Sequence, residues 1–343
     1  MKKRLTTVLL LFALALSLTA CSQPTGDSTA DAGSGGETYE IIFGHPFNPG
    51  TPQADIAEQF KTRIEEVTDG QITVTIFPAG QLGSHTDMFE AMQMGTQHMS
   101  ILPSARISGF APEMQVFDLP FLFPDRETAY KIFDGEIGRE IMDTLDDSGV
   151  KGLTICEDGF KHFTANEKIE TLDDFKGLKM RTMESPIIME QFNAMGSNPV
   201  PIDYSELYNS LQNHTVDGQE NPLATISTLK LYEVQDYMLY SEHAYLAQIL
   251  LVSKSWYESL PTDLQDDILT VAKEVTEWER QEIQNLEAGY LQEVKDSGTT
   301  VYELSDAERE RFRTAMASVY EVGEELIGKD LLDKVVAACE SAG

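Results

Sequence analysis

The sequence is poor in cysteine and in basic residues. Its 343 residues include three cysteines, too few for the disulfide framework of a small secreted domain. Cys156 and Cys339 are expected to be buried free thiols, with a disulfide between them as the alternative. The 25 lysines and arginines stand against 57 aspartates and glutamates, for a net charge of −32. This balance argues against nucleic acid or an anionic lipid surface as a partner.

Recognisable catalytic and metal-binding patterns are also missing. The chain has no Gly-x-Ser-x-Gly elbow, no His-Glu-x-x-His and no Gly-x-x-x-x-Gly-Lys-Ser/Thr phosphate loop. Its six histidines include no pair spaced four residues apart, and its cysteines are not spaced like a zinc site. The sequence therefore predicts no metal site, no cofactor and no enzymatic activity. A surface hydrolase that uses Glu157 and Asp158 as paired acids is the alternative from the enzyme class.

Long hydrophobic runs are scarce as well. The apolar segment at residues 8–18 follows three basic residues and is too short to cross a bilayer, which takes about 20 residues in a helix. It ends in Leu-Thr-Ala-Cys at residues 18–21, which resembles the lipobox of bacterial lipoproteins. We expect a lipoprotein signal peptide at residues 1–20 and a membrane contact only through a lipid anchor at Cys21. The alternative is an ordinary secretory signal with a chance cysteine.

The folded part of the chain begins after a flexible segment. Residues 21–38 are rich in small and polar side chains, which predicts a tether. A strand pattern at residues 39–44 is followed by a helix that Thr51 and Pro52 open, and by a second strand pattern at residues 71–77. Strand, helix and strand in this order predict an α/β domain with a largely parallel sheet.

The rest of the chain continues this alternation and ends in helices. Residues 152–156 and 178–182 have the pattern of strands, and apolar spacing predicts one unusually long helix over residues 261–298. A coiled-coil partner surface is the alternative for that helix. Ser305 and Glu308 form a predicted capping box ahead of the last helices.

Six short motifs occur in order along the chain. They are Gly-Gln-Leu-Gly at 80–83, Phe-Asp-Leu-Pro-Phe-Leu-Phe at 117–123, Gly-Phe-Lys-His-Phe-Thr at 159–164, Gly-Leu-Lys-Met-Arg-Thr at 177–182, Pro-Ile-Asp-Tyr-Ser-Glu-Leu-Tyr at 201–208 and Val-Asp-Gly-Gln-Glu-Asn-Pro at 216–222. Together they resemble the signatures of DctP-type substrate-binding proteins of TRAP (tripartite ATP-independent periplasmic) transporters. The likeness runs from about Tyr39 to Tyr302.

This resemblance implies a receptor of two α/β domains joined by a hinge, with the long helix spanning both. The implied domains are residues 39–158 plus 247–286, and residues 159–246 plus 287–343 with the C-terminal helices. The implied function is to bind a small organic acid in the periplasm or at the outer face of the cell membrane and to deliver it to TRAP membrane subunits. An ABC-type solute receptor and a purely structural lipoprotein are the alternatives.

The resemblance also implies a set of ligand contacts in the second domain. Arg181 matches the family arginine that grips the ligand carboxylate, and a planar guanidinium suits that group because it can bind it bidentately. Lys161 matches a second cationic position, Asn221 a hydrogen-bonding asparagine, and Tyr204 an aromatic position beside the ligand. The alternatives are a salt bridge for Arg181, a structural turn for Asn221 and core packing for Tyr204.

In the first domain, the ligand-facing loops are expected to carry four polar residues. These are His45, Asn48, His85 and Ser104, while Pro103 replaces an acidic contact of some relatives. Polar loops of this kind suit ligand hydroxyls, which favours a sugar acid such as a uronate or aldonate over a C4-dicarboxylate or keto acid. As the alternative, each histidine is simply a polar loop residue.

Overall fold

The computed structural model describes residues 37–342. The expected signal peptide, Cys21 and the tether up to residue 36 lie outside the described residues. Within the described part of the chain, none of the helices combines the length and the hydrophobicity that a bilayer crossing requires.

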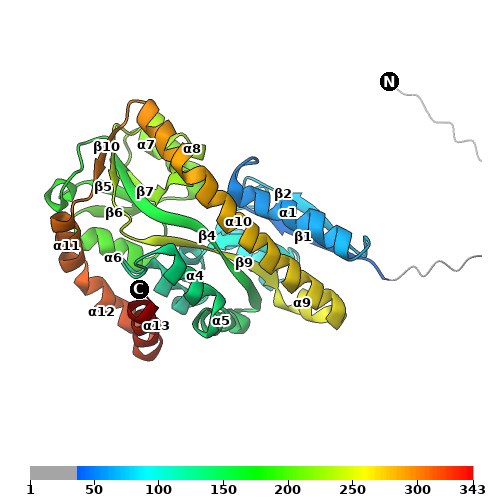
Figure 1. Ribbon diagram of the computed structural model, residues 1–343. Helices are drawn as coiled ribbons and strands as arrows, with labels where there is room; N and C mark the ends of the chain where they lie inside the picture. Colours follow the sequence, from blue (N-terminus) through cyan, green and yellow to red (C-terminus); the bar gives the residue numbers. More distant parts are fainter. Residues whose placement is uncertain (1–36, 343) are drawn as a thin grey trace, which may run out of the picture. The chain divides into compact units, whose positions relative to one another are not determined.

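The described strands form one mixed ten-stranded sheet (Figure 1). The strands are β1 (Tyr39–Gly44), β2 (Ile72–Phe77), β3 (Met99–Pro103), β4 (Val150–Ala165), β5 (Lys179–Thr182), β6 (Asn198–Pro201), β7 (Gly218–Pro222), β8 (Tyr237–Tyr240), β9 (Tyr245–Ser253) and β10 (Thr300–Glu303). Their order across the sheet is β2-β1-β3-β9-β4-β7-β5-β6, and β8 pairs with β4 and β10. The sheet is therefore α/β in type, as expected, with β4 and β9 between its two halves.

Helices follow most strands. They are α1 (Pro52–Val67), α2 (His85–Gln93), α3 (Ser104–Ile107), α4 (Arg126–Asp134), α5 (Glu136–Asp143), α6 (Pro186–Ala194), α7 (Leu207–Gln212), α8 (Leu223–Thr228), α9 (Lys254–Ser259), α10 (Thr262–Asp296), α11 (Asp306–Ala315), α12 (Ala317–Ile327) and α13 (Lys329–Ala342).

The opening β1-α1-β2 unit forms as the sequence predicts. The Thr51 hydroxyl caps α1 by accepting from the Ala54 amide at 3.2 Å, and Pro52 occupies the first turn, where its missing amide hydrogen is not needed. Strand β1 runs parallel to β2 and β3. The prediction of a largely parallel sheet is only partly right, because β9 pairs antiparallel with both β3 and β4.

Strand β4 is much longer than predicted. It has 16 residues, where the sequence pattern indicated a strand only at residues 152–156. Nearly all of its side chains are buried, so apolar and polar residues do not alternate in the way that marks a half-exposed strand. Its register with β9 shifts between Glu157 and Gly159, where Asp158 is the extra residue of a β-bulge.

The predicted long helix is α10, which has 35 residues. Figure 1 shows it crossing one face of the sheet, on the side turned to the viewer, and it contacts α1, β4 and α8. Its apolar face is buried at Leu264, Ile268 and Val275. Because α1 connects β1 to β2 and α8 follows β7, α10 packs against elements of both halves of the sheet.

Helix α11 begins as predicted, but its capping box does not close. The Ser305 hydroxyl accepts from the Glu308 amide at 3.3 Å. The Glu308 carboxylate accepts instead from the Leu172 amide at 2.9 Å and from Arg311. This acidic side chain therefore ties α11 to a distant loop.

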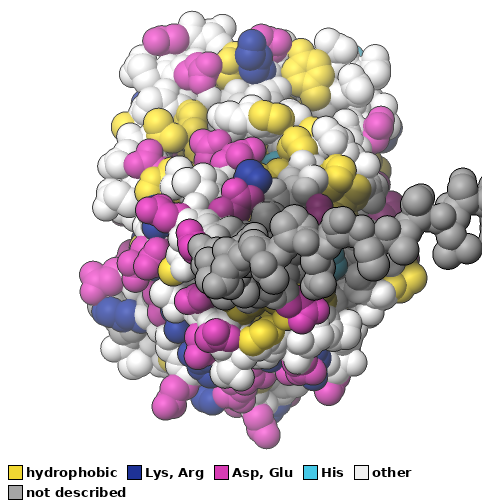
Figure 2. Space-filling model, turned by 90° about the vertical axis from the view of Figure 1, so that its right-hand side faces the viewer, with side chains coloured by type: hydrophobic (Ala, Val, Ile, Leu, Met, Phe, Trp, Pro, Cys, Tyr) yellow, Lys and Arg dark blue, Asp and Glu magenta, His cyan; other side chains and the backbone are white. Residues whose placement is uncertain are grey.

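The hydrophobic core contains both described cysteines. Cys156 packs in the cluster that joins β1, α1 and α10, and Cys339 packs in the cluster that includes α12 and α13. Both are buried free thiols, as expected. The surface, in contrast, is acidic: Figure 2 shows Asp and Glu side chains spread over the face turned to the viewer.

Candidate functional site

A small cavity lies where the two halves of the sheet meet. Twelve residues from eight separate stretches of the chain line it: Phe47, His85, Pro103, Arg106, Asp158, Arg181, Met183, Tyr204, Asn221, Thr225, Leu246 and Gln248. Its volume of about 20 Å³ is close to what a single water molecule needs. The walls must therefore move apart before a larger molecule can enter.

Arg181 is a buried cation at this cavity. It comes from β5, where side chains alternate between the two faces of the strand. Met180 points into the hydrophobic core, so Arg181 points to the other face. Its Nε donates to the carbonyl oxygen of Ile202 at 2.9 Å, and its exposed fraction is 2%. Among residues 37–342, no carboxylate forms an ion pair with this guanidinium. Burial, and then the nearby charge of Arg106, lower the pKa of Arg181 to about 9.

Arg106 is a second cation at the cavity, and the sequence interpretation missed it. It lies on α3, in the segment where Pro103 and Ser104 had been singled out. Its Nη2 donates to the Ile202 carbonyl at 3.1 Å, and its Nη1 lies 3.3 Å from the Asp203 carboxylate. Its Nε is buried without a hydrogen-bond partner among the described residues. The available signal was its position three residues after Pro103, because Pro103 ends β3 and ligand-facing residues were expected in the segment that follows this strand.

His85 lies beside these two arginines. It is buried at the first turn of α2 and lines the cavity. Burial, followed by the charges of Arg106 and Arg181, lowers the pKa of His85 to about 3. Its imidazole is therefore neutral at ordinary pH, and the two guanidinium groups supply the positive charge of this part of the cavity.

Asp158 brings a carboxyl group into the same cavity. It takes hydrogen bonds from the side-chain amides of Gln53 and Gln248, the latter at 3.2 Å. Burial raises the pKa of Asp158 to about 7. The neighbouring Glu157 does not line the cavity, and its oxygens are occupied by Arg126 at 3.1 Å and by two tyrosine hydroxyls. The two acids therefore do not form the pair that a hydrolase would need.

The structure brings together four of the residues predicted to bind ligand. Arg181, His85, Tyr204 and Asn221 all line the cavity. Tyr204 packs edge-on against Phe47 with a ring-centroid distance of 6.0 Å. The side-chain amide of Asn221 donates to Gln219.

The other four predicted residues do not line this cavity. His45 is buried beside it, with its ring stacked on Phe47 at 6.1 Å, and Asn48 is exposed. The Ser104 hydroxyl donates to Asp118 at 3.2 Å. Their roles as ligand contacts stay predictions.

Lys161 is directed away from the cavity by the register of β4. It pairs opposite Pro222, whereas the cavity residue Asn221 pairs opposite His162, so the side chains of Lys161 and Asn221 point to opposite faces. The Lys161 ammonium forms a buried ion pair with Glu220 at 2.7 Å, and Glu220 also contacts His243 at 2.7 Å. Burial opposes the ionisation of Glu220, yet Lys161 and His243 together lower the pKa of Glu220 to about 2.

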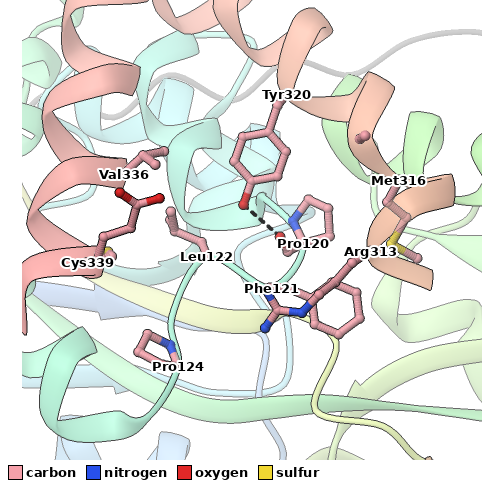
Figure 3. Close-up of a pocket in the computed structure, with 11 residues that line it drawn as sticks. Pro120, Phe121, Leu122, Pro124, Arg313, Met316, Tyr320, Val336 and Cys339 are labelled. Carbon is pink, nitrogen blue, oxygen red and sulfur yellow. Dashed lines mark hydrogen bonds between the residues drawn. The ribbon is translucent and has the colours of Figure 1, made fainter. Parts of the chain in front are cut away.

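A larger groove of about 500 Å³ lies elsewhere, between the loop at residues 120–124 and the C-terminal helices. Figure 3 shows that its walls are mostly apolar, with Arg313 against the ring of Phe121 and the Tyr320 hydroxyl bonded to the Pro120 carbonyl at 2.8 Å. Its charged residues, Arg313 and Glu340, are exposed. The groove therefore lacks the buried charges that distinguish the small cavity.

Comparison with known proteins gives consistent matches over most of the chain. Residues 43–326 match the family model DctP, bacterial extracellular solute-binding protein, family 7. The C4-dicarboxylate-binding periplasmic protein DctP of Rhodobacter capsulatus is 34% identical over 307 residues, which cover 88% of this chain and 91% of that protein.

Two solved structures share the fold. The sugar acid binding protein DctPAm of Advenella mimigardefordensis, in complex with galactonate, has a TM-score of 0.87 and 33% identity, and the match covers 90% of this chain and 99% of that one. A TRAP periplasmic solute binding protein of Sulfurospirillum deleyianum, with bound succinate, has a TM-score of 0.83 and 35% identity, with 88% and 99% covered. The α/β architecture expected from the sequence motifs is thus confirmed, and the chain belongs to the DctP family, bacterial extracellular solute-binding protein family 7.

Proposed function

We propose that this protein is the extracytoplasmic receptor of a TRAP transporter and that it binds a small organic acid in the cavity between the halves of its sheet. Closure of two domains around the ligand would precede its delivery to the membrane subunits. No chemical change of the ligand is involved. A sugar acid, such as an aldonate or uronate, is the favoured ligand.

The unpaired charge of Arg181 is the observation that carries this proposal. A buried cation without a counter-charge is costly, because the protein interior solvates it poorly. A carboxylate supplied by a ligand would remove that cost and fill the planar fork of the guanidinium. Arg106 adds a second positive charge at the same place, and both guanidinium groups contact the Ile202 carbonyl.

The remaining cavity residues suit a small polar acid. Charged hydrogen bonds contribute about 1.5 to 3 kcal/mol each, so a carboxylate bound bidentately by Arg181 would account for much of the affinity. We propose that the amide of Asn221 and the hydroxyl of Tyr204 bind further ligand oxygens. The acidic surface repels anions at a distance, so local cations are needed to hold one (Figure 2).

Contacts across the proposed domain boundary suggest how the receptor closes. We propose domains at residues 39–158 plus 247–286 and at residues 159–246 plus 287–343, with β4, β9 and α10 connecting them. Arg106 in the first domain contacts Ile202 and Asp203 in the second, and Phe47 packs against Tyr204. A ligand held by both sides would favour the closed state, because an open state lacks half of the contacts.

The proposed location follows from the N-terminal sequence. We infer that residues 1–20 are removed as a signal peptide and that Cys21 carries the lipid anchor. Two or more acyl chains are enough to hold a folded domain stably at a membrane. A membrane extract labelled with radioactive palmitate tests this point, since wild type should incorporate the label and a Cys21→Ser variant should not.

Calorimetry tests the proposed ligand class. Purified protein is first screened by thermal shift against aldonates, uronates, dicarboxylates and keto acids, and the best acids are then titrated into wild type and into Arg181→Ala. We expect binding to disappear in Arg181→Ala while circular dichroism stays native. Arg313→Ala, which removes an exposed arginine of the apolar groove, is the matched control and should bind like wild type.

Three outcomes would contradict the proposal. Undiminished affinity in Arg181→Ala would remove the assigned role of that residue. Absence of any stabilising organic acid would favour a structural lipoprotein, and turnover of a bound acid would favour an enzyme. An ABC-type receptor has the same binding chemistry, so co-purification with TRAP membrane subunits in reconstituted liposomes distinguishes the transporter class.

A further inference from the structure

The β-bulge in β4 gives Asp158 an unusual position. In a regular strand, residues 157 and 159 would share one face and residue 158 the other, but here Asp158 is left out of the pairing between β4 and β9. Gly159 makes the bulge possible, because its φ of 107° lies in the left-handed region that glycine adopts without strain. The bulge aims the carboxyl group of Asp158 into the cavity, where its exposed fraction is 3%.

The cavity therefore has two poles of opposite chemistry. Arg106 and Arg181 form one pole, at the Ile202 carbonyl. Asp158 forms the other, and among the described residues it interacts with two glutamine amides and the Thr225 hydroxyl and makes no ion pair with either arginine. Tyr204 lies within electrostatic reach of both poles, because Asp158 raises and Arg181 lowers the pKa of its hydroxyl, after the larger raising effect of burial.

Gln248 adds a hydrogen-bond acceptor at the Asp158 pole that no residue of the described part of the chain satisfies. Its side chain is 1% exposed, and its amide nitrogen donates to Asp158. Its amide oxygen is buried without a hydrogen-bond partner among the described residues. A buried acceptor without a hydrogen bond costs free energy. A ligand that donates a hydrogen bond to this oxygen would remove that cost.

We propose that Asp158 and Gln248 are the specificity-determining residues of this receptor and that they bind hydroxyl groups of the ligand, at the end opposite to its carboxylate. This inference rests on the proposed function, since it assumes that Arg181 binds the carboxylate. It assigns the ligand to the polyhydroxy monocarboxylic acids and excludes acids with a carboxylate at both ends.

The chemistry of the two residues explains this selection. Asp158 accepts a glutamine amide on each oxygen and also interacts with the Thr225 hydroxyl, and a carboxylate has about four acceptor sites, so it can accept a ligand hydroxyl as well. A hydroxyl can also accept a hydrogen bond from a neutral carboxyl, and it can donate a hydrogen bond to the amide oxygen of Gln248. A second ligand carboxylate has no hydrogen to donate when ionised, and it would repel the charge of Asp158 in a site without room for screening water.

Pairs of acids that differ at one end test the proposal. D-galactonate and D-erythronate are compared with galactarate and meso-tartrate, in which the terminal hydroxymethyl group is replaced by a carboxylate. Succinate serves as the dicarboxylate without hydroxyls. Titrations at pH 8 keep Asp158 ionised. We expect wild type to bind at least one aldonate, and to bind it at least about tenfold more tightly than its matched aldarate and than succinate.

Two variants test whether Asp158 and Gln248 are the residues that distinguish an aldonate from an aldarate. Asp158→Asn keeps the shape but removes the negative charge, so the ratio of aldonate to aldarate affinity should fall towards one. Gln248→Met removes the unpartnered oxygen at similar volume and should weaken aldonate binding at least about tenfold. If Asp158→Asn fails to fold by circular dichroism, Gln248→Met still carries the test.

The possible failures are distinguishable. Tight binding of aldarate or succinate by wild type, an unchanged ratio in folded Asp158→Asn, or no binding of any aldonate would overturn the assignment of the hydroxyl pole. In each of these cases the loss of binding in Arg181→Ala would leave the receptor function standing. Binding that survives Arg181→Ala would instead remove the proposed function itself.

Discussion

The guanidinium groups of Arg106 and Arg181 meet at a single carbonyl oxygen, that of Ile202, with donor distances of 3.1 and 2.9 Å. Arg106 comes from α3 and Arg181 from β5, so two distant segments place like charges side by side. A carbonyl offsets only part of that repulsion. The arrangement is costly in the free protein and favourable once an anion binds, which leads to the first two predictions.

Replacement of Arg181 by methionine should separate binding from stability. Arg181→Met removes a buried charge that has no counter-ion, so the ligand-free variant should unfold at the same temperature as wild type or above it. Its affinity for the organic acid should fall at least about 100-fold, because two charged hydrogen bonds are lost. Thermal unfolding with and without ligand measures both effects. A variant that is less stable when ligand-free would show that Arg181 serves mainly as a structural residue.

Arg106 should act mainly on ligand release. Arg106→Ala removes the contacts to Ile202 and Asp203 that join the proposed domains, so the closed state should open sooner and ligand dissociation should speed up about tenfold or more. Stopped-flow dissociation measures this rate. Asp203→Asn is the control, because Asp203 is half exposed and its ion pair should contribute less than about 1 kcal/mol. Equal effects of the two variants would argue against a separate role for Arg106.

Lys161 should prove to be a structural residue. Lys161→Met leaves the carboxylate of Glu220 buried with His243 as its remaining contact, and loss of one partner of a buried pair costs about 3 to 5 kcal/mol. The double variant Lys161→Met with Glu220→Met should recover most of that stability. Urea unfolding measures both. If Lys161→Met is as stable as wild type and binds ligand weakly, the ligand contact predicted from the sequence is the correct role.

Acid should destabilise the protein through His45. Burial lowers the pKa of His45 from 6.5 to about 4, so below pH 6.5 the unfolded chain takes up a proton that the folded protein does not. Stability is therefore lost as the pH falls, by about 2 kcal/mol between pH 7.5 and pH 5 for this group.

Two buried carboxyls act in the opposite direction. Burial raises the pKa of Asp118 to about 6 and that of Asp158 to about 7, so both favour the folded state as the pH falls. The effect of His45 is thus measured as a difference between wild type and His45→Gln in urea unfolding at each pH. The free energy of unfolding of wild type should fall by about 2 kcal/mol relative to that of His45→Gln between pH 7.5 and pH 5, and a difference that stays constant with pH would show that His45 is not the responsible group.

Local features of the fold could be predicted from the sequence because they depend on residues close together in the chain. Thr51 and Pro52 start α1 with their own side chains, and the apolar spacing of α10 repeats every turn. The family motifs likewise identified Arg181, whose alternation with Met180 puts it on the opposite face from the core. These features need no knowledge of what packs against them.

The composition of the cavity was decided by the tertiary structure. Arg106 reaches Ile202 across 96 residues of chain, and no local pattern records that contact. The register of β4 against β7 turns Lys161 away from Asn221, and one extra residue in β4 turns Asp158 towards the cavity. The sequence by itself determined the opening β1-α1-β2 unit, the long helix α10 and which arginine carries the family signature. The face that each side chain presents depends on strand pairing and on a bulge, and these are fixed only when distant segments pack together.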